Sequence, residues 1–111
     1  MEVLAHDGTD RPTAMHIHGN LGVTLLEQGR LDEAEDELRT ALDGLDATVG
    51  PRHPSVGRVR RDLGRVLLAR GRPAAAEAEL LAALEILRAS LPADHPALAQ
   101  VEARIDEVER P

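Results

Sequence analysis

The sequence repeats itself at an offset of 42 residues, and this repetition constrains the fold more than any other feature. Residues 20–56 align without a gap on residues 62–98. Identical pairs along this alignment include Leu21 and Leu63, Gly22 and Gly64, Gly29 and Gly71, Ala34 and Ala76, Leu38 and Leu80, Ala41 and Ala83, and Leu45 and Leu87. A period of this length is typical of proteins built from stacked supersecondary units. We therefore expect two full repeats, followed by the first helix of a third.

Apolar residues within each unit recur at positions i, i+3, i+7 and i+10, which is the spacing of one face of an α-helix. Two stripes show this spacing: Val56, Val59, Leu63 and Val66, then Leu98, Val101, Ile105 and Val108. The apolar spacing predicts five helices, over residues 12–28, 32–48, 54–70, 73–90 and 96–109. Each is long enough to bury one face against a neighbour and too short to be stable alone.

Glycine, proline and histidine mark the expected helix ends. Gly29 and Gly71 each follow an apolar stretch, where a left-handed residue ends a helix and opens a tight turn. The pairs His53-Pro54 and His95-Pro96 suit a helix start. Backbone N–H groups in the first turn of a helix have no partner within the helix, so the missing N–H of proline costs nothing there. Since the same pair occurs in both units, we predict that these histidines help to start the next helix and take no part in catalysis.

The composition favours packed helices. The chain has 111 residues, enough for one domain, and it contains no Phe, Tyr, Trp or Cys. A core of Leu, Val, Ile and Ala fits helices better than a β-sandwich or barrel, so we expect an all-α fold. The absence of Cys excludes a disulfide, a thiol nucleophile and a Cys-ligated zinc site.

The charge balance argues against nucleic acid as a partner. With 13 basic and 20 acidic side chains, the formal net charge is −7. Binding to phosphate backbones draws on an excess of cations. No apolar run approaches the length of a membrane span or of a signal-peptide core. We therefore expect a cytoplasmic protein that contacts neither nucleic acid nor membrane.

The repeated residues resemble the tetratricopeptide repeat (TPR) family. Each unit reads Leu-Gly-x-x-Leu, then Gly-Arg, then Ala-x-x-x-Leu-x-x-Ala-Leu. The period and the Gly/Pro-x-x-His-Pro linker resemble the kinesin-light-chain type of repeat that is common in bacterial proteins. The resemblance implies a right-handed solenoid of antiparallel helix pairs. It also implies close helix approach at the family's small positions, which are Gly22, Gly64, Ala34, Ala76, Ala41 and Ala83.

This resemblance covers residues 12–109 and divides the chain. We expect four segments: a flexible lead-in over residues 1–11, repeat 1 over 12–53, repeat 2 over 54–95 and a C-terminal capping helix over 96–111. The capping helix should present a polar outer face, because Glu109 stands where the two repeats have Leu25 and Leu67.

Family resemblance also implies the class of function. TPR proteins are scaffolds that hold segments of other proteins and carry out no chemistry, so we expect a non-catalytic protein–protein interaction module. No cofactor, metal site or catalytic residue is expected. His16 and His18 are two positions apart on one helix, so they point to different faces and do not share a metal easily. The acidic run over residues 32–37 is interpreted as a solvated helix face.

Basic residues gather on the helix over residues 54–70, which carries five Arg against a single Asp. In the family that this chain resembles, one face of each repeat's first helix lines a concave groove. That face gives six candidate peptide-binding residues here: Asn20, Arg58, Arg61, Asp62, Arg65 and Arg104. The family often has an Asn at the position of Asn20 that bonds the backbone of a ligand. In a competing interpretation, the arginines pair with Asp and Glu of neighbouring helices.

Two kinds of partner follow from these residues. The arginines favour a protein segment that bears acidic side chains or a C-terminal carboxylate. The alternative function is self-association as a homodimer, as an element of a larger regulatory protein. In that case Met15 and Ile17 would cover or join an open edge of the solenoid, where exposed apolar surface tends to associate.

Overall fold

The computed structural model describes the backbone of residues 11–110 and the side chains of residues 14–110. The described residues form α1 (Arg11–Glu27), α2 (Leu31–Thr48), α3 (Pro54–Ala69), α4 (Pro73–Ser90) and α5 (Pro96–Glu109), with no strand among them. The predicted all-α fold is confirmed, and each predicted helix agrees with the observed one to within one residue at either end. The expected lead-in lies, apart from Arg11, outside the described residues.

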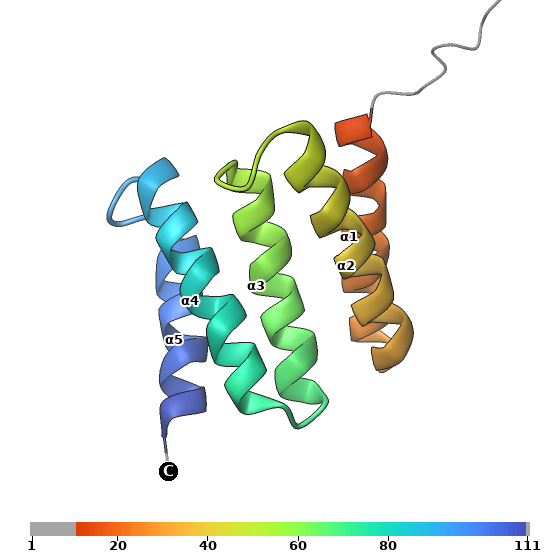
Figure 1. Cartoon of the computed structure of the whole chain (residues 1–111). Coiled ribbons are helices and arrows are strands. Elements are labelled where there is room, and N and C mark those ends of the chain that lie inside the picture. Colours follow the sequence, from red (N-terminus) through yellow and green to blue (C-terminus); the bar gives the residue numbers. More distant parts are fainter. Residues whose placement is uncertain (1–10, 111) are drawn as a thin grey trace, which may run out of the picture.

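The helices form pairs that stack in chain order (Figure 1). Within the repeats, α1 packs against α2 and α3 packs against α4. Between the repeats, α2 packs against α3 and α4 packs against α5. The first helices also contact one another, α1 with α3 and α3 with α5. This arrangement is that of a TPR-like helical repeat, and it places α1, α3 and α5 along one face.

Aliphatic side chains fill the space between the helices. The bulkiest of the fully buried ones are Leu38, Leu45, Leu63, Leu67, Leu80, Leu87, Val56, Val66 and Val101. Small residues let the helices of each pair approach closely. A Cβ atom on Gly22 would lie 2.6 Å from Cγ of Leu38, and one on Gly64 would lie 2.7 Å from Cγ of Leu80. The close approach expected at these positions is confirmed.

The helix ends follow the predicted chemistry. Gly29 and Gly71 have φ angles of 78° and 75°, a conformation that glycine adopts without strain. Nδ1 of His53 accepts a hydrogen bond of 3.1 Å from the backbone N–H two residues further on. Nδ1 of His95 accepts the equivalent bond of 3.0 Å. The two histidines therefore cap α3 and α5, and their predicted structural role is confirmed.

An ion-pair cluster around Glu35 joins the two repeats. The Glu35 residue is only 7% exposed, and its Oε2 accepts a hydrogen bond of 2.9 Å from Nε of Arg39. Its Oε1 accepts another, also of 2.9 Å, from Nη1 of Arg70, which lies just beyond the end of α3. Arg70 in addition pairs with Asp32 at 2.6 Å. These contacts tie the start of α2 to the end of α3.

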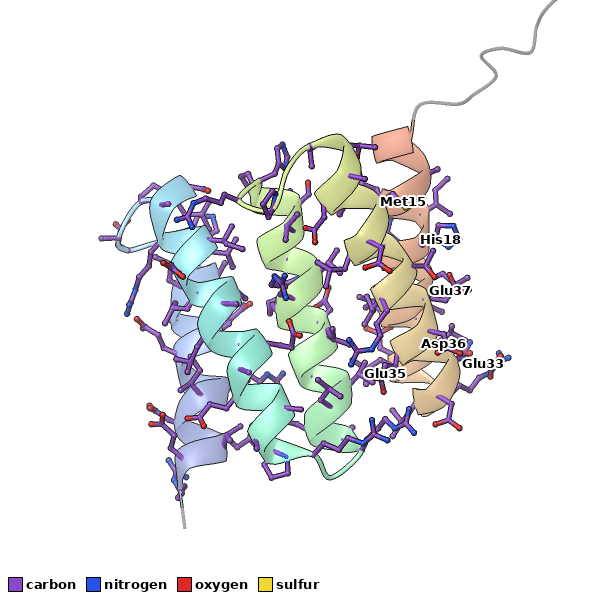
Figure 2. The ribbon with its side chains drawn as sticks, in the orientation of Figure 1. Met15, His18, Glu33, Glu35, Asp36 and Glu37 are labelled. Carbon is purple, nitrogen blue, oxygen red and sulfur yellow. The ribbon has the colours of Figure 1, made fainter. Side chains whose placement is uncertain are left out.

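The acidic run at the start of α2 is therefore only partly a solvated face. Glu33 and Asp36 are exposed on the outer side of α2, as predicted (Figure 2). Glu35 is buried, and Glu37 lies 2.6 Å from Nδ1 of His18 on α1. The interpretation is wrong for Glu35, because Arg70 reaches it from the end of α3, and it holds only in part for Glu37, which is half-buried against His18 of α1.

Removing the charge of Glu35 is expected to destabilise the chain by about 1–3 kcal/mol at neutral pH. Burial raises the pKa of this carboxyl, but the hydrogen bond from Arg39 and the charges of Arg39, Arg70 and Arg72 outweigh it, so the pKa lies below its usual 4.5. The stabilisation is thus present above pH 4.5 and is lost as the pH falls through the lowered pKa. In urea denaturation, the chain and its Glu35→Gln variant should differ at neutral pH, and the difference should shrink as the pH falls below 4.5.

The matched control for this prediction is Glu33→Gln. The Glu33 carboxylate also pairs with an arginine, Arg30, but its side chain is 58% exposed. Water screens such a pair, so its loss should cost less than about 0.5 kcal/mol. Equal losses in the two variants would contradict a special role for the cluster around Glu35.

Met15 does not lie at the outer edge of α1, where the self-association alternative places it. Its side chain packs over Gly44 of α2, and a Cβ atom on Gly44 would overlap the Met15 thioether. In repeat 2 the large and the small residue change places. Gly57 stands at the position of Met15 and Ile86 at the position of Gly44. A Cβ atom on Gly57 would lie 3.0 Å from Cγ2 of Ile86. Ile17, by contrast, is 62% exposed. The expectation is wrong for Met15, because the missing side chain of Gly44 leaves space on α2 that it fills.

Candidate functional site

The first helices of the repeats share a face that is hollowed along its length. One hollow lies between α1 and α3, and a second lies between α3 and α5, with Arg61 in the lining of both. A third hollow, toward the C-terminal ends of these helices, shares Arg65 and Arg104 with the second. We call this continuous surface of α1, α3 and α5 the groove.

All six predicted binding residues line the groove. Those on α1 and the first half of α3 surround the first hollow: Asn20, Arg58, Arg61 and Asp62. Those around the second hollow are Arg61, Arg65 and Arg104. The structure therefore brings together residues from three helices that are far apart in the sequence. Their role in binding stays a prediction.

Asp62 holds two of the groove arginines. Its side chain is 8% exposed, and Oδ1 lies 3.1 Å from Nε of Arg61 and 3.3 Å from Nη1 of Arg65. Both guanidinium groups stay partly exposed toward the groove. One buried carboxylate thus orients two cations and neutralises only half of their charge.

The competing interpretation of the arginines applies outside the groove. Arg60 pairs with Glu79 of α4 at 2.8 Å, and Arg70 pairs with residues of α2. Within residues 14–110, neither Arg58 nor Arg104 has a carboxylate at ion-pair distance. The first two hollows of the groove therefore carry four arginines and one carboxylate.

Two features of the groove were missed by sequence reasoning. Nε2 of His16 and Oγ of Ser55 form a hydrogen bond of 2.9 Å that joins α1 to α3. Leu26 and Leu68 give the third hollow an apolar part, beside Glu27 and Glu107. The leucines occupy matched positions of the repeat and could have been found from it. No pattern in the sequence marks the contact between His16 and Ser55, which are 39 residues apart.

The two neighbouring histidines point to different faces of α1, as predicted. His16 bonds Ser55 of α3, whereas His18 bonds Glu37 of α2. Within the described part of the chain, no cluster of three or more potential ligands from His, Cys, Asp and Glu could hold a metal ion.

Comparison with known proteins agrees with this architecture. The model of the tetratricopeptide repeat family matches residues 12–89, which include nearly all of α1 to α4. A search of curated proteins returns no match. Among the described helices, none combines the length and the apolar character that a bilayer span requires. The kinesin-light-chain type, the bacterial origin and the cytoplasmic location stay predictions. The matched region includes the contacts of Gly22 with Leu38 and of Gly64 with Leu80, and the chain belongs to the tetratricopeptide repeat family.

Proposed function

We propose that the groove of this protein–protein interaction module binds a partner segment that bears acidic side chains or a C-terminal carboxylate. Membership of the TPR family supports an interaction module, since its members are generally non-catalytic scaffolds. The observation that carries the proposal is the imbalance of charge in the groove. Four arginines and one carboxylate line its first two hollows, in a chain whose net charge is −7, whereas Glu27 and Glu107 line the third.

The second hollow offers the strongest place for an anionic group. A carboxylate that enters it meets Arg61 and Arg65 of α3 and Arg104 of α5. Guanidinium groups prefer such planar partners and bind them through two parallel hydrogen bonds. Asp62 keeps the first two guanidinium groups in place, so in this proposal it positions the arginines and does not itself contact the ligand.

The ends of the groove suggest how the rest of the segment lies. Asn20 is exposed on α1 beside the first hollow, where its amide would bond the backbone of the segment. Leu26 and Leu68 line the third hollow and would contact an apolar side chain. The proposed ligand is therefore a segment with acidic residues in its centre and an apolar residue at one end.

Reversing two groove charges is expected to weaken binding of an acidic peptide at least about tenfold. The variant carries Arg58→Glu and Arg104→Glu, because neither residue pairs with the buried carboxylate of Asp62. A short labelled peptide of alternating Glu and Ala, with a free C-terminus, is titrated and followed by fluorescence anisotropy. Binding to the unchanged chain should fall as salt rises, since exposed charges are screened.

The control variant carries Arg30→Glu and Arg88→Glu, which change the net charge equally. Both side chains are more than half exposed and lie outside the groove. This variant should bind the peptide within a factor of about two of the unchanged chain. Equal weakening by both variants would indicate general charge repulsion, and undiminished binding by the groove variant would place the peptide elsewhere. Either result contradicts the proposal.

A further inference from the structure

The second hollow of the groove is lined by hydrogen-bond donors and by no carboxylate. Its lining consists of Arg61 and Arg65 of α3 and of Gln100 and Arg104 of α5. The three arginines among them carry a permanent positive charge. Within residues 14–110, the one carboxylate that pairs with them is that of Asp62, whose Oδ1 lies 3.1 Å from Nε of Arg61 and 3.3 Å from Nη1 of Arg65. The hollow therefore keeps an excess of two positive charges.

These arginines keep more donors free than one carboxylate accepts. Arg61 donates to Asp62 from Nε and Nη2, and Arg65 donates from Nη1 alone. Arg104 has no carboxylate at ion-pair distance within the described residues. A carboxylate offers two oxygens and a single charge, so it would leave part of the positive charge without a partner. A phosphate monoester has three terminal oxygens and a charge of about −1.5 to −2 at neutral pH, which matches the excess.

The third hollow disfavours a run of acidic side chains along the groove. Glu27 of α1 and Glu107 of α5 line it beside Leu26 and Leu68. A ligand with many carboxylates would bring like charges together at this end of the groove, which is unfavourable. One doubly charged group in the second hollow, followed by an uncharged residue, avoids this repulsion. The distribution of charge therefore favours a single phosphate over several carboxylates.

We propose that the second hollow binds the phosphate of a phosphoserine or phosphothreonine in a segment of a partner protein. This inference rests on the proposed function and names the anionic group that the groove prefers. A segment is favoured over a free phosphate ion, because the second hollow shares residues with both other hollows, where Asn20 and Leu68 would contact the rest of the segment. A nucleic acid is disfavoured, because its many phosphates would be repelled by a chain with a net charge of −7.

Three labelled peptides test this preference by fluorescence anisotropy with the full chain. They differ only in the central residue, which is phosphoserine, Glu or Ser. The flanking residues are uncharged and include a Leu on either side, and the C-terminus is amidated so that it carries no carboxylate. The phosphoserine peptide should bind at least about tenfold more tightly than the Glu peptide, and the Ser peptide should bind most weakly.

Two substitutions at Arg104 test whether the second hollow provides the preference. Arg104 is exposed, so helicity and the thermal midpoint should not change. Arg104→Gln should weaken binding of the phosphoserine peptide at least about tenfold and binding of the Glu peptide about threefold or less. Arg104→Lys keeps the charge but loses the planar fork, so it should weaken only the phosphoserine peptide, by about threefold or more. Arg88→Gln on α4, outside the groove, is the control and should change each affinity less than about twofold.

Two results would overturn the inference at its chemical centre. If the phosphoserine and Glu peptides bound equally well, the groove would not prefer a phosphate, while the proposed function would still be judged by the peptide of alternating Glu and Ala. Failure of that peptide and of all three new peptides to bind would contradict both proposals. A preference for phosphoserine that persisted in Arg104→Gln would place the phosphate outside the second hollow.

Two further titrations test the source of the phosphate. Inorganic phosphate should displace the phosphoserine peptide only at concentrations far above the dissociation constant of the peptide, because the free ion makes none of the flanking contacts. Displacement by inorganic phosphate near that constant would show a site for the free ion. A labelled single-stranded oligonucleotide should bind more weakly than the phosphoserine peptide. Tighter binding of the oligonucleotide would show a nucleic-acid site, and either of these contrary results overturns the proposal.

Discussion

Shortening Leu80 to Ala is expected to lower the free energy of unfolding by about 2–5 kcal/mol. The Leu80 side chain is fully buried, and it lies directly against the backbone of α3 at Gly64. Gly64 has no side chain that could fill the space that the leucine leaves. A cavity would remain, and its cost adds to that of the lost apolar burial. Leu38 meets Gly22 in the same way, so Leu38→Ala should have an effect of similar size.

The neighbouring residue provides the control for this prediction. Leu81→Ala is the same chemical change on the same helix, but Leu81 is 48% exposed, so the cost should stay below about 1 kcal/mol. Urea denaturation at neutral pH measures both differences. A loss below about 0.5 kcal/mol for Leu80→Ala would place this side chain at the surface and contradict the packing of α3 on α4.

The helices could be predicted from the sequence because their ends are encoded by nearby residues. Gly29 and Gly71 stop helices through a backbone conformation that side chains disfavour, and His53 and His95 start them through a bond to a residue two positions away. Neither device depends on the rest of the fold. The repeat then supplied the missing long-range information, since matched positions occupy equivalent places in a stack.

The repeat therefore predicted which residues line the groove. It did not predict which side chains form ion pairs with one another. Asn20 and Arg104 share a face because each stands at a groove position of its repeat. The burial of Glu35 depends on Arg70, which is 35 residues away and is brought near only when the repeats stack. The ion pairs of Asp62 with two arginines of its own helix were not predicted either, although Asp62 lines the first hollow as expected.

Replacing Met15 by a small residue and Gly44 by a large one should show that the effects of the two changes on stability are coupled. Met15→Gly alone should cost about 2–4 kcal/mol, because it leaves a space over Gly44 and adds a glycine to α1. Gly44→Ile alone should cost about 1–3 kcal/mol, because the new side chain would overlap the Met15 thioether. Repeat 2 already contains the exchanged arrangement, with Gly57 on the first helix and Ile86 on the second.

The double variant tests this correspondence. With both changes, the isoleucine would fill the space left by Met15, as Ile86 does over Gly57, so the double variant should be less destabilised than the sum of the single changes by about 1–3 kcal/mol. Urea denaturation of the four chains gives this coupling energy. Met15→Gly combined with Leu81→Ala is the control, and it should be additive within about 0.5 kcal/mol because the two residues lie on α1 and α4, which are not in contact.

Additive losses at Met15 and Gly44 would mean that the two repeats pack differently despite their aligned sequences. A large favourable coupling would mean that stacking requires a fixed total volume at this crossing and leaves open which helix supplies it. The same volume is provided from α1 in repeat 1 and from α4 in repeat 2. A position-by-position comparison of the repeats treats the pairs Met15 and Gly57, and Gly44 and Ile86, as two unrelated mismatches, whereas the packing makes them one compensated exchange.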